Sequence, residues 1–268
     1  MCSSPPRGGT AQLSPLVEFA PLVAQLDTMR SQGRRIRMWW RDDDSYRDTT
    51  ELRRLLMARR NIPIALAVIP GLLDETLTNL IHDSNRVSVL QHGWKHIDWS
   101  GGKSRPSEFP DSRSTFEVSE QLRSGRELLE KTFGSRFDPV LVPPWHSISR
   151  WLLENFGDLG YLAVSNEAPL FPLLSRGWGS REINIEIDTS DWTRQGAFIG
   201  SREVARRLLR AFELRQKWNS ESFPIGILTH HAVLTPSDCD SLGSFICMLE
   251  EVGCVEWLSV KGMLDGEL

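Results

Sequence analysis

Residues 36–44 read IRMWWRDDD, a β-type run that ends in three consecutive aspartates, Asp42, Asp43 and Asp44. Residues 91–96 read QHGWKH and end a second β-type run with two histidines, His92 and His96. Carboxylates and imidazoles at the ends of two strands can share one divalent cation, and three protein ligands leave a position open for water or substrate. The sequence therefore predicts a catalytic divalent-metal site.

Short apolar runs alternate with amphipathic segments along the rest of the chain. The pattern predicts strands at 36–41, 63–69, 87–91, 139–142, 161–164, 183–187, 224–228 and 255–258. Between and around them it predicts helices at 16–29, 49–60, 73–84, 116–133, 149–156, 201–219 and 237–251. Such alternation indicates parallel β–α units, and seven or eight units favour a barrel over an open sheet. We expect an α/β barrel domain over residues 14–268 and a disordered Pro/Gly/Ser-rich tail over residues 1–13.

Composition excludes some classes of partner. A formal net charge of −4 over 268 residues argues against nucleic acid, because phosphate binding needs a basic surface. No stretch approaches the length of a membrane span, and residues 1–10 lack the apolar segment of a secretory signal. We therefore expect a cytoplasmic location and no membrane partner, while the oligomeric state stays open. The ten tryptophans suit both stacking on sugar rings and filling a core.

Polar and aromatic residues follow several predicted strands. In α/β barrels the active site forms at the carboxyl ends of the strands. The segments placed there are 42–44, 92–96, 143–145, 188–192 and His230. Residues far apart in the sequence thus meet at one rim, and this convergence is stronger evidence than any single motif.

Each of these segments also has a structural interpretation. Three consecutive aspartates are common in solvated turns, but residues 48–51 already provide a helix N-cap. The triplet is therefore free to divide labour between a metal ligand and a general base. His92 and His96, at i and i+4 on a helical turn, would present their rings on one face. The segment 99–114 is either a surface connection or a lid that contacts substrate.

His230 and His231 end a late predicted strand, so alternation allows only one of them to face the site. Such a histidine can act as a general acid or simply lie at the surface. A carboxylate hydrogen-bonded to it would raise its pKa and fix its tautomer, and residues 188–192 contain candidates. That segment is otherwise typical of a turn.

In order along the chain, these segments resemble the polysaccharide deacetylase family, the NodB-type carbohydrate esterases. The family motifs are an Asp-Asp pair, His-x-x-x-His, an Arg-Pro-Pro-type loop, Asp-x-x-Asp-Trp and Leu-x-His. Their counterparts are residues 43–44, 92–96, 143–145, 188–192 and 228–230. The resemblance spans roughly residues 36–231. WWRDDD, QHGW and VPPW are similar to a divergent bacterial subgroup.

The resemblance implies a distorted (β/α) barrel of about seven strands, one bound divalent metal ion, in this family usually Zn²⁺, and hydrolysis of N-acetyl groups on a carbohydrate substrate. Asp44, His92 and His96 would hold the metal. In a shifted alternative, Asp42 would be the base and Asp43 the ligand. Asp43 would take a proton from the attacking water. His230 would protonate the leaving amine. Asp191, or alternatively Asp188, would be the carboxylate that raises the pKa of His230. Substrate contacts would come from Pro144, Trp145, Trp192 and Trp94.

Two departures leave other functions open. The family has an arginine before Pro-Pro, held near the base, where this chain has Val142, so Arg41 or Arg37 would have to substitute. His146 and Ser147 replace the Asn-Arg of the closer subgroup, and His146 either makes a polar contact or faces solvent. The alternatives are a non-catalytic glycan-binding relative and an amidohydrolase that acts on a small, non-sugar C–N bond.

Overall fold

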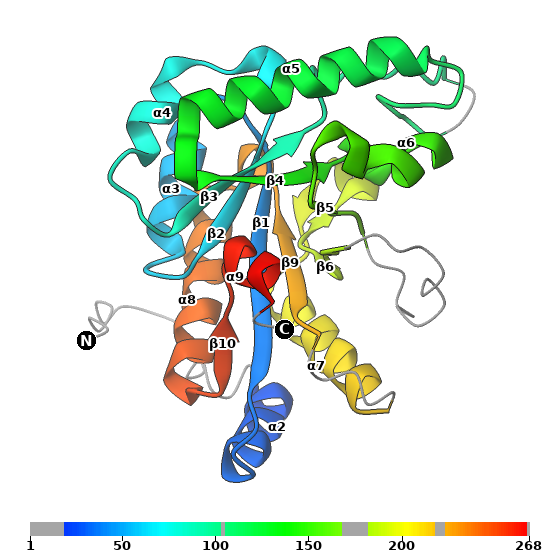
Figure 1. The fold of residues 1–268 in the computed structure, drawn as a ribbon. Coiled ribbons are helices and arrows are strands. Elements are labelled where there is room, and N and C mark those ends of the chain that lie inside the picture. Colours follow the sequence, from blue (N-terminus) through cyan, green and yellow to red (C-terminus); the bar gives the residue numbers. More distant parts are fainter. Residues whose placement is uncertain (1–18, 103–104, 168–181, 218–222, 267–268) are drawn as a thin grey trace.

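A parallel sheet forms the centre of the computed structural model, which describes residues 19–102, 105–167, 182–217 and 223–266 (Figure 1). Its strand order is β5-β4-β3-β2-β1-β9-β6, and β10 pairs with the amino-terminal half of β1. The strands are β1 (Ile36–Ser45), β2 (Ile64–Val68), β3 (Val87–His92), β4 (Phe137–Val142), β5 (Ala163–Val164), β6 (Ile187–Asp188), β9 (Ile225–Thr229) and β10 (Val255–Trp257).

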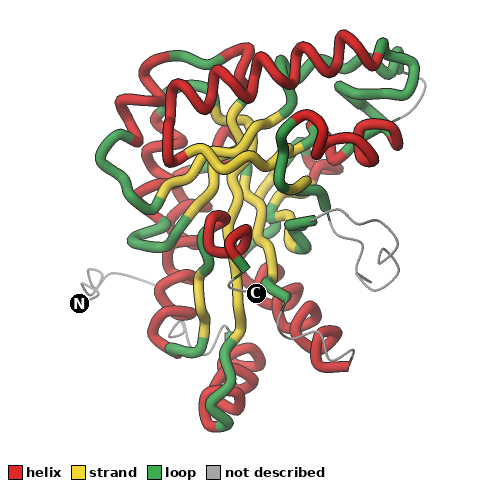
Figure 2. Tube along the Cα trace, viewed as in Figure 1, coloured by secondary structure: helices red, strands yellow, loops and turns green. Residues whose placement is uncertain are grey.

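The sheet curls until its two edges nearly meet, as the strand trace in Figure 2 shows. Isolated parallel bridges join Val164 to Glu182 and Glu167 to Ile185, so the segment before β6 lies beside the residues that follow β5. The seven-strand path and this incomplete closure confirm the predicted distorted (β/α) barrel.

Helices cover the outer face of the sheet, except the last helix, whose apolar side chains pack into the barrel interior. In order they are α2 (Ala20–Ser31), α3 (Thr50–Ala58), α4 (Glu75–Ile81), α5 (Thr115–Phe133), α6 (Arg150–Asn155), α7 (Ser201–Lys217), α8 (Pro236–Val252) and α9 (Val260–Asp265). Alternation along β1 divides its side chains between two cores. Met38 and Trp40 pack outward against the helices, whereas Trp39 joins the barrel interior together with Met263 of α9.

Several boundaries differ from the predicted ones. β1 continues to Ser45, so the aspartates lie within the strand rather than after it, and His92 is the last residue of β3. Three short elements were missed: α9 and the antiparallel strands β7 (Ser190–Asp191) and β8 (Ala197–Phe198). These elements are too short to give a periodic pattern. The predicted tail at 1–13 lies outside the described residues. Among the described helices, none has the length and apolarity needed to cross a membrane.

Candidate metal and catalytic site

Asp44, His92 and His96 come together at the carboxyl end of the barrel. Nε2 of His92 lies 3.2 Å from Oδ1 of Asp44, and Nε2 of His96 lies 3.3 Å from the same oxygen. One ligand atom from each residue falls within a group no wider than 4.8 Å. The two imidazole rings, 5.1 Å apart, both face the carboxylate. The structure therefore brings together the three residues predicted as metal ligands.

The protonation pattern of His92 suits a cation at this place. Its Nδ1 lies 3.0 Å from the carbonyl oxygen of Val142, which can only accept a hydrogen bond. In the neutral ring Nδ1 therefore carries the proton, and Nε2 directs a lone pair at Asp44. Oδ1 of Asp44 is buried and receives no well-directed hydrogen bond within the described chain. Converging acceptors of this kind need a cation between them, and the donor set fits a divalent metal ion.

A left-handed residue at the end of β1 turns Asp44 toward this site. Strict alternation would place Asp44 on the same face as Asp42, away from the barrel interior. Asp44 has a φ of 68°, and the register between β1 and β2 shifts between Asp42 and Ser45. This bulge brings the adjacent carboxylates of Asp43 and Asp44 to the same side of the sheet.

The turn that carries His96 is built around a buried carboxylate. The spacing of His92 and His96 was expected to form a helical turn; that expectation is wrong, because Gly93 and His96 both have a φ of 56°. Oε2 of Glu108 accepts a hydrogen bond from the Trp94 amide at 3.0 Å, and Oε1 accepts one from Lys95 at 2.7 Å. A Cβ atom at Gly93 would overlap Oε2 of Glu108, so only glycine fits there.

The second half of the segment 99–114 is therefore attached to the site, through the hydrogen bonds that Glu108 accepts from the histidine turn. Ser107, Glu108 and Phe109 are all buried, and the Trp99 amide donates to the Ser107 carbonyl at 2.8 Å. Glu108 was not identified from the sequence, because a glutamate in a loop has nothing that marks it as buried. This part of the segment supports the histidine turn instead of forming a loose surface connection.

Arg41 holds Asp43 from within the same strand. The two residues share the interior face of β1, and Arg41 is fully buried. Its Nε lies 2.8 Å from Oδ1 of Asp43, and its Nη2 donates to Oδ2 at 3.0 Å. Nη1 of Arg41 donates to the hydroxyl and the carbonyl oxygen of Ser165. Of the two arginines considered as substitutes at Val142, Arg41 takes the place near the base, whereas Arg37 pairs with Glu256.

Charge keeps both interior aspartates ionised. Burial alone would raise the pKa of Asp43, but Arg41 and, to a smaller extent, His92 outweigh burial and lower that pKa. Burial would likewise raise the pKa of Asp44, whereas a hydrogen bond from His92 and the charges of His92 and His96 in their protonated forms bring that pKa well below its usual range. Both groups are therefore carboxylates at neutral pH.

Asp42 belongs to a separate network on the outer side of β1. Its Oδ1 accepts hydrogen bonds from the Thr229 hydroxyl at 2.7 Å and from the His231 amide at 3.0 Å. Its Oδ2 lies 2.6 Å from Nδ1 of His231. Both members of this pair are buried. The geometry therefore excludes the shifted register, in which Asp42 and Asp43 would have been base and ligand.

His230 faces the interior while His231 faces outward, as alternation required. Nδ1 of His230 lies 3.9 Å from Oδ1 of Asp188 and 3.4 Å from the Ser190 hydroxyl. Trp192 packs edge-on against the His230 ring at 4.8 Å and donates its indole N–H to Asp188. The carboxylate beside His230 is thus Asp188, the less favoured of the two predicted.

Asp191 points to other partners. Its Oδ1 accepts hydrogen bonds from the amide and hydroxyl of Thr193, and its Oδ2 pairs with Arg194 at 2.7 Å. This carboxylate caps the short 3₁₀ turn at Trp192–Arg194. Sequence spacing could not distinguish the two aspartates, because between them the chain leaves the main sheet, where β6 ends at Asp188, and enters the separate β7–β8 hairpin, which contains Asp191.

The residues predicted to contact substrate lie around the same end of the barrel. Trp145 packs against His96 with ring centroids 4.2 Å apart, and Pro144 is buried beneath the histidine turn. Trp94 is half-buried, and its backbone carbonyl accepts from Gly71. Trp192 is 55% exposed, which leaves a face of its ring free to stack.

Two consecutive left-handed residues follow β4. Trp145 and His146 have φ values of 54° and 53°, a strained arrangement for non-glycine residues that is typical of functional sites. Burial and the nearby charge of Arg41 lower the pKa of His146 to about 3. His146 is therefore a neutral imidazole beside Asp43 and His92, and not a solvent-facing side chain.

Comparison of the fold with solved structures gives a consistent answer. A peptidoglycan N-acetylglucosamine deacetylase has a TM-score of 0.56 and 16% identity, with 86% of this chain and 88% of that chain covered. A candidate polysaccharide deacetylase from Mycobacterium smegmatis has a TM-score of 0.54 and 18% identity, with 94% and 85% covered. This chain has the polysaccharide deacetylase fold. No protein-family model and no curated protein matches its sequence.

A further structure with the polysaccharide deacetylase fold contains a metal. It is a family 4 acetyl xylan esterase from Clostridium thermocellum in complex with a cobalt ion, with a TM-score of 0.51 and 14% identity. The match covers 85% of this chain and 90% of that chain. At such identities the likeness concerns the fold, so the chemistry of this chain depends on its own side chains.

Proposed function

We propose that this protein is a member of the polysaccharide deacetylase family and a divalent-metal-dependent hydrolase. Its reaction is removal of N-acetyl groups from an amino-sugar oligo- or polysaccharide. The observation that carries the proposal is the convergence of Asp44, His92 and His96 beside a second carboxylate, Asp43, which Arg41 holds in place. Metal ligands and a separate base within one site are what hydrolysis of an amide requires.

Asp44, His92 and His96 would hold the ion, and two imidazoles with one carboxylate suit zinc. When bound, the ion supplies Lewis-acid chemistry at the acyl carbonyl and stabilises the negative charge that develops there. The hydrogen bond from Nδ1 of His92 to Val142 fixes the orientation of that ring before any ion binds.

The remaining residues divide the proton transfers. Asp43, ionised and oriented by Arg41, accepts the proton of the attacking water. His230 gives a proton to the leaving amine, and Asp188 and Trp192 orient its ring. Acetate and a free amine leave the site. The exposed face of Trp192 and the ring of Trp145 form an aromatic border that suits a sugar ring.

Arg41 removes the main support for a non-catalytic glycan-binding relative, because it supplies the guanidinium that Val142 lacks. An amidohydrolase that acts on a small C–N bond would use the same metal ligands and base, but it would have no need of the aromatic border. The cytoplasmic location expected from the sequence stays a prediction.

Acetate release and metal content test the proposal together. We expect the purified protein to bind zinc with 1:1 stoichiometry and to release acetate from N-acetylated chitooligosaccharides faster than from small acetamides. His92→Ala should lose both properties, while the matched variant His82→Ala, at an exposed histidine, should keep both. Asp43→Asn should keep zinc and lower the turnover rate by about 10²-fold or more.

A protein that binds no zinc, or whose acetate release survives His92→Ala, would contradict the metal-dependent mechanism. Faster release from small acetamides than from chitooligosaccharides would favour the amidohydrolase alternative instead.

A further inference from the structure

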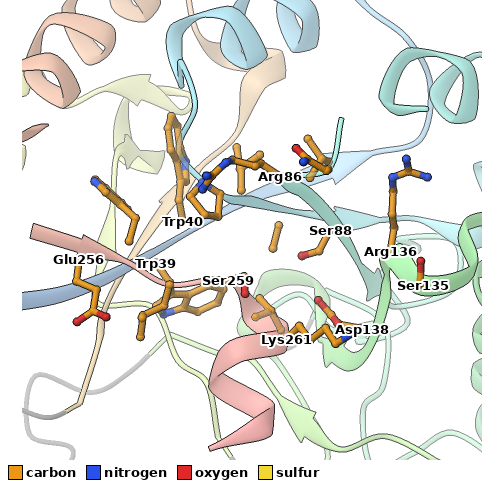
Figure 3. Close-up of a pocket in the computed structure, with 18 residues that line it drawn as sticks. Trp39, Trp40, Arg86, Ser88, Ser135, Arg136, Asp138, Glu256, Ser259 and Lys261 are labelled. Atoms are coloured by element: carbon orange, nitrogen blue, oxygen red, sulfur yellow. The ribbon is translucent and has the colours of Figure 1, made fainter. Parts of the chain in front are cut away.

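A cavity, drawn in Figure 3, lies where the strands begin, at the opposite end of the barrel from Asp44 and the histidines. It has a volume of about 600 Å³. Its walls form where strands begin, at Ile64 of β2, Val87 of β3 and Asp138 of β4, and β10 and the first turn of α9 complete it. The candidate metal site uses the carboxyl ends of the strands, so the length of the strands separates the two places.

One wall of this cavity carries a buried carboxyl group, one oxygen of which has no hydrogen-bond donor. Asp138, the second residue of β4, is only 5% exposed, and its Oδ2 has no hydrogen-bond partner within the described chain. Burial raises the pKa of Asp138 to about 6, although the hydroxyl of Ser88 and the charge of Lys261 act in the opposite direction. Figure 3 shows Asp138 and Lys261 lying together on this wall. A buried acceptor without a donor destabilises the fold unless something in the cavity satisfies it.

A hydrogen-bond donor lines the same cavity. The indole Nε1 of Trp257, in β10, is buried without an acceptor among the described residues. The ring itself is half-buried. An unsatisfied donor and an unsatisfied acceptor therefore belong to residues that line one partly open cavity. A ligand that can both donate and accept would satisfy them together.

The charges around the cavity argue against a bare ion. Arg86, Arg136 and Lys261 bring positive charge to the lining, and Asp138 and Glu256 bring negative charge. An anion would meet the Asp138 carboxylate, and a cation would meet Lys261 beside it, each at an unfavourable electrostatic energy. Neutral hydroxyl groups avoid both penalties, since each hydroxyl is at once a donor and an acceptor.

Apolar surface completes the lining. Trp39 and Trp40, on opposite faces of β1, both line the cavity (Figure 3), together with aliphatic side chains that include Ile64 and Leu258. A sugar ring offers C–H groups to such a surface and hydroxyl groups to the polar residues, and the space suits one small ligand.

The geometry points to a carbohydrate-binding site in this cavity, separate from the metal site, that takes one neutral sugar unit. Asp138 accepts a hydrogen bond from a sugar hydroxyl, and the Trp257 indole donates to a sugar oxygen. The site needs neither a metal ion nor an acetyl group, so it goes beyond the proposed deacetylation and would persist if that proposal failed.

NMR of the tryptophan indole groups tests this site. The Trp257 indole signal is assigned by its absence in Trp257→Phe, which keeps the ring and removes only the N–H. The titrations use the His92→Ala variant, in which the metal site is disabled, at about pH 8, where the Asp138 carboxyl is ionised because the pH lies above its pKa. Glucose, galactose and N-acetylglucosamine are added first, and inorganic phosphate and propylamine are tested afterwards as an anion and a cation. We expect the Trp257 signal to shift saturably with at least one sugar and not with the two ions.

Asp138→Asn supplies the second variant in the same background. Loss of the charge-assisted hydrogen bond should weaken sugar binding about 10-fold. Asp158→Asn, at an exposed aspartate that does not line the cavity, should leave sugar binding unchanged. The proposal is overturned if no sugar shifts the Trp257 signal, if phosphate or propylamine binds instead, or if Asp138→Asn binds as tightly as the parent.

Discussion

At the scale of single residues, the interior face of β1 carries a buried carboxylate, Asp43, whose charge is balanced by one arginine, Arg41. Arg41 and Asp43 are both buried, and each is the counterion of the other. Because a charge left alone in a buried site is far less stable than a pair, removing one partner should cost more than removing both.

We therefore expect Arg41→Met to lower the free energy of unfolding by about 3–5 kcal/mol. The double variant Arg41→Met/Asp43→Asn should recover a substantial part of this loss, because the unpaired carboxylate is then gone. Urea denaturation of the parent, the two single variants and the double variant measures the coupling. Additive effects of the two substitutions would show that the pair is not energetically linked.

Glu108 acts on the site through the backbone of the histidine turn. Its two oxygens each accept one amide hydrogen bond, and glutamine has only one such oxygen. Glu108→Gln should therefore loosen the turn that carries His96 and weaken zinc binding about 10- to 100-fold, as loss of supporting contacts does in metal sites.

Calorimetric zinc titration measures this effect, and Glu117→Gln, at an exposed position in α5, is the matched control. Unchanged zinc affinity in Glu108→Gln would mean that His96 keeps its position without the carboxylate.

At the scale of elements, the start of β4 carries a carboxyl group that opposes folding at neutral pH. Burial raises the pKa of Asp138 from 3.8 to about 6, an effect that Ser88 and Lys261 reduce and Asp265 adds to. The folded state therefore binds this proton more tightly than the unfolded state does. The contribution of Asp138 to stability is highest below about pH 4 and decreases as the pH rises through about 6.

Asp138→Asn should remove this pH dependence. We expect the variant to be more stable than the parent by about 1–3 kcal/mol above pH 6, with the difference vanishing toward pH 4. Thermal unfolding at a series of pH values measures it, in the absence of sugar. A variant less stable than the parent at pH 8 would show that the carboxylate has a partner in the folded protein that its neighbours do not account for.

The elements differ in how well their sequences predict them. α3 and α5 begin at the N-caps Thr49 and Ser114, and their apolar periodicity is regular, so their ranges were predicted closely. The pair β7–β8 contains two residues in each strand, which is too few for a period to show. Its effect is nevertheless large, because it moves Asp191 away from His230.

At the scale of the whole molecule, the candidate metal ligands come from two strands and the turn after one of them. Binding of an ion would therefore link β1 to β3 across the intervening strand β2. An ion that binds only the folded state stabilises it by about 3 kcal/mol at a concentration 100 times its Kd.

We expect zinc at that concentration to raise the Tm of the parent by about 5–10 °C, and a chelator to reverse the change. Differential scanning calorimetry measures it, with His92→Ala as the variant that should not respond. An equal rise in His92→Ala would assign the stabilising ion to some other place on the protein.

The sequence alone predicted the barrel, the end of the barrel at which polar residues gather, and the grouping of Asp44, His92 and His96 that the structure shows. These follow from patterns that are local in the chain, namely strand–helix alternation and the residues that end each strand. These predictions also do not depend on the exact residue at which a helix or strand begins or ends.

Only the tertiary structure decided how the aspartates of 36–44 divide their roles. The left-handed residue at Asp44 turns two adjacent carboxylates to one face, while Asp42 turns outward to His231. Arg41, Glu108 and Asp188 gained their positions in the same way. Each depends on which neighbours burial brings within hydrogen-bonding distance, and a pattern along one chain does not contain that information.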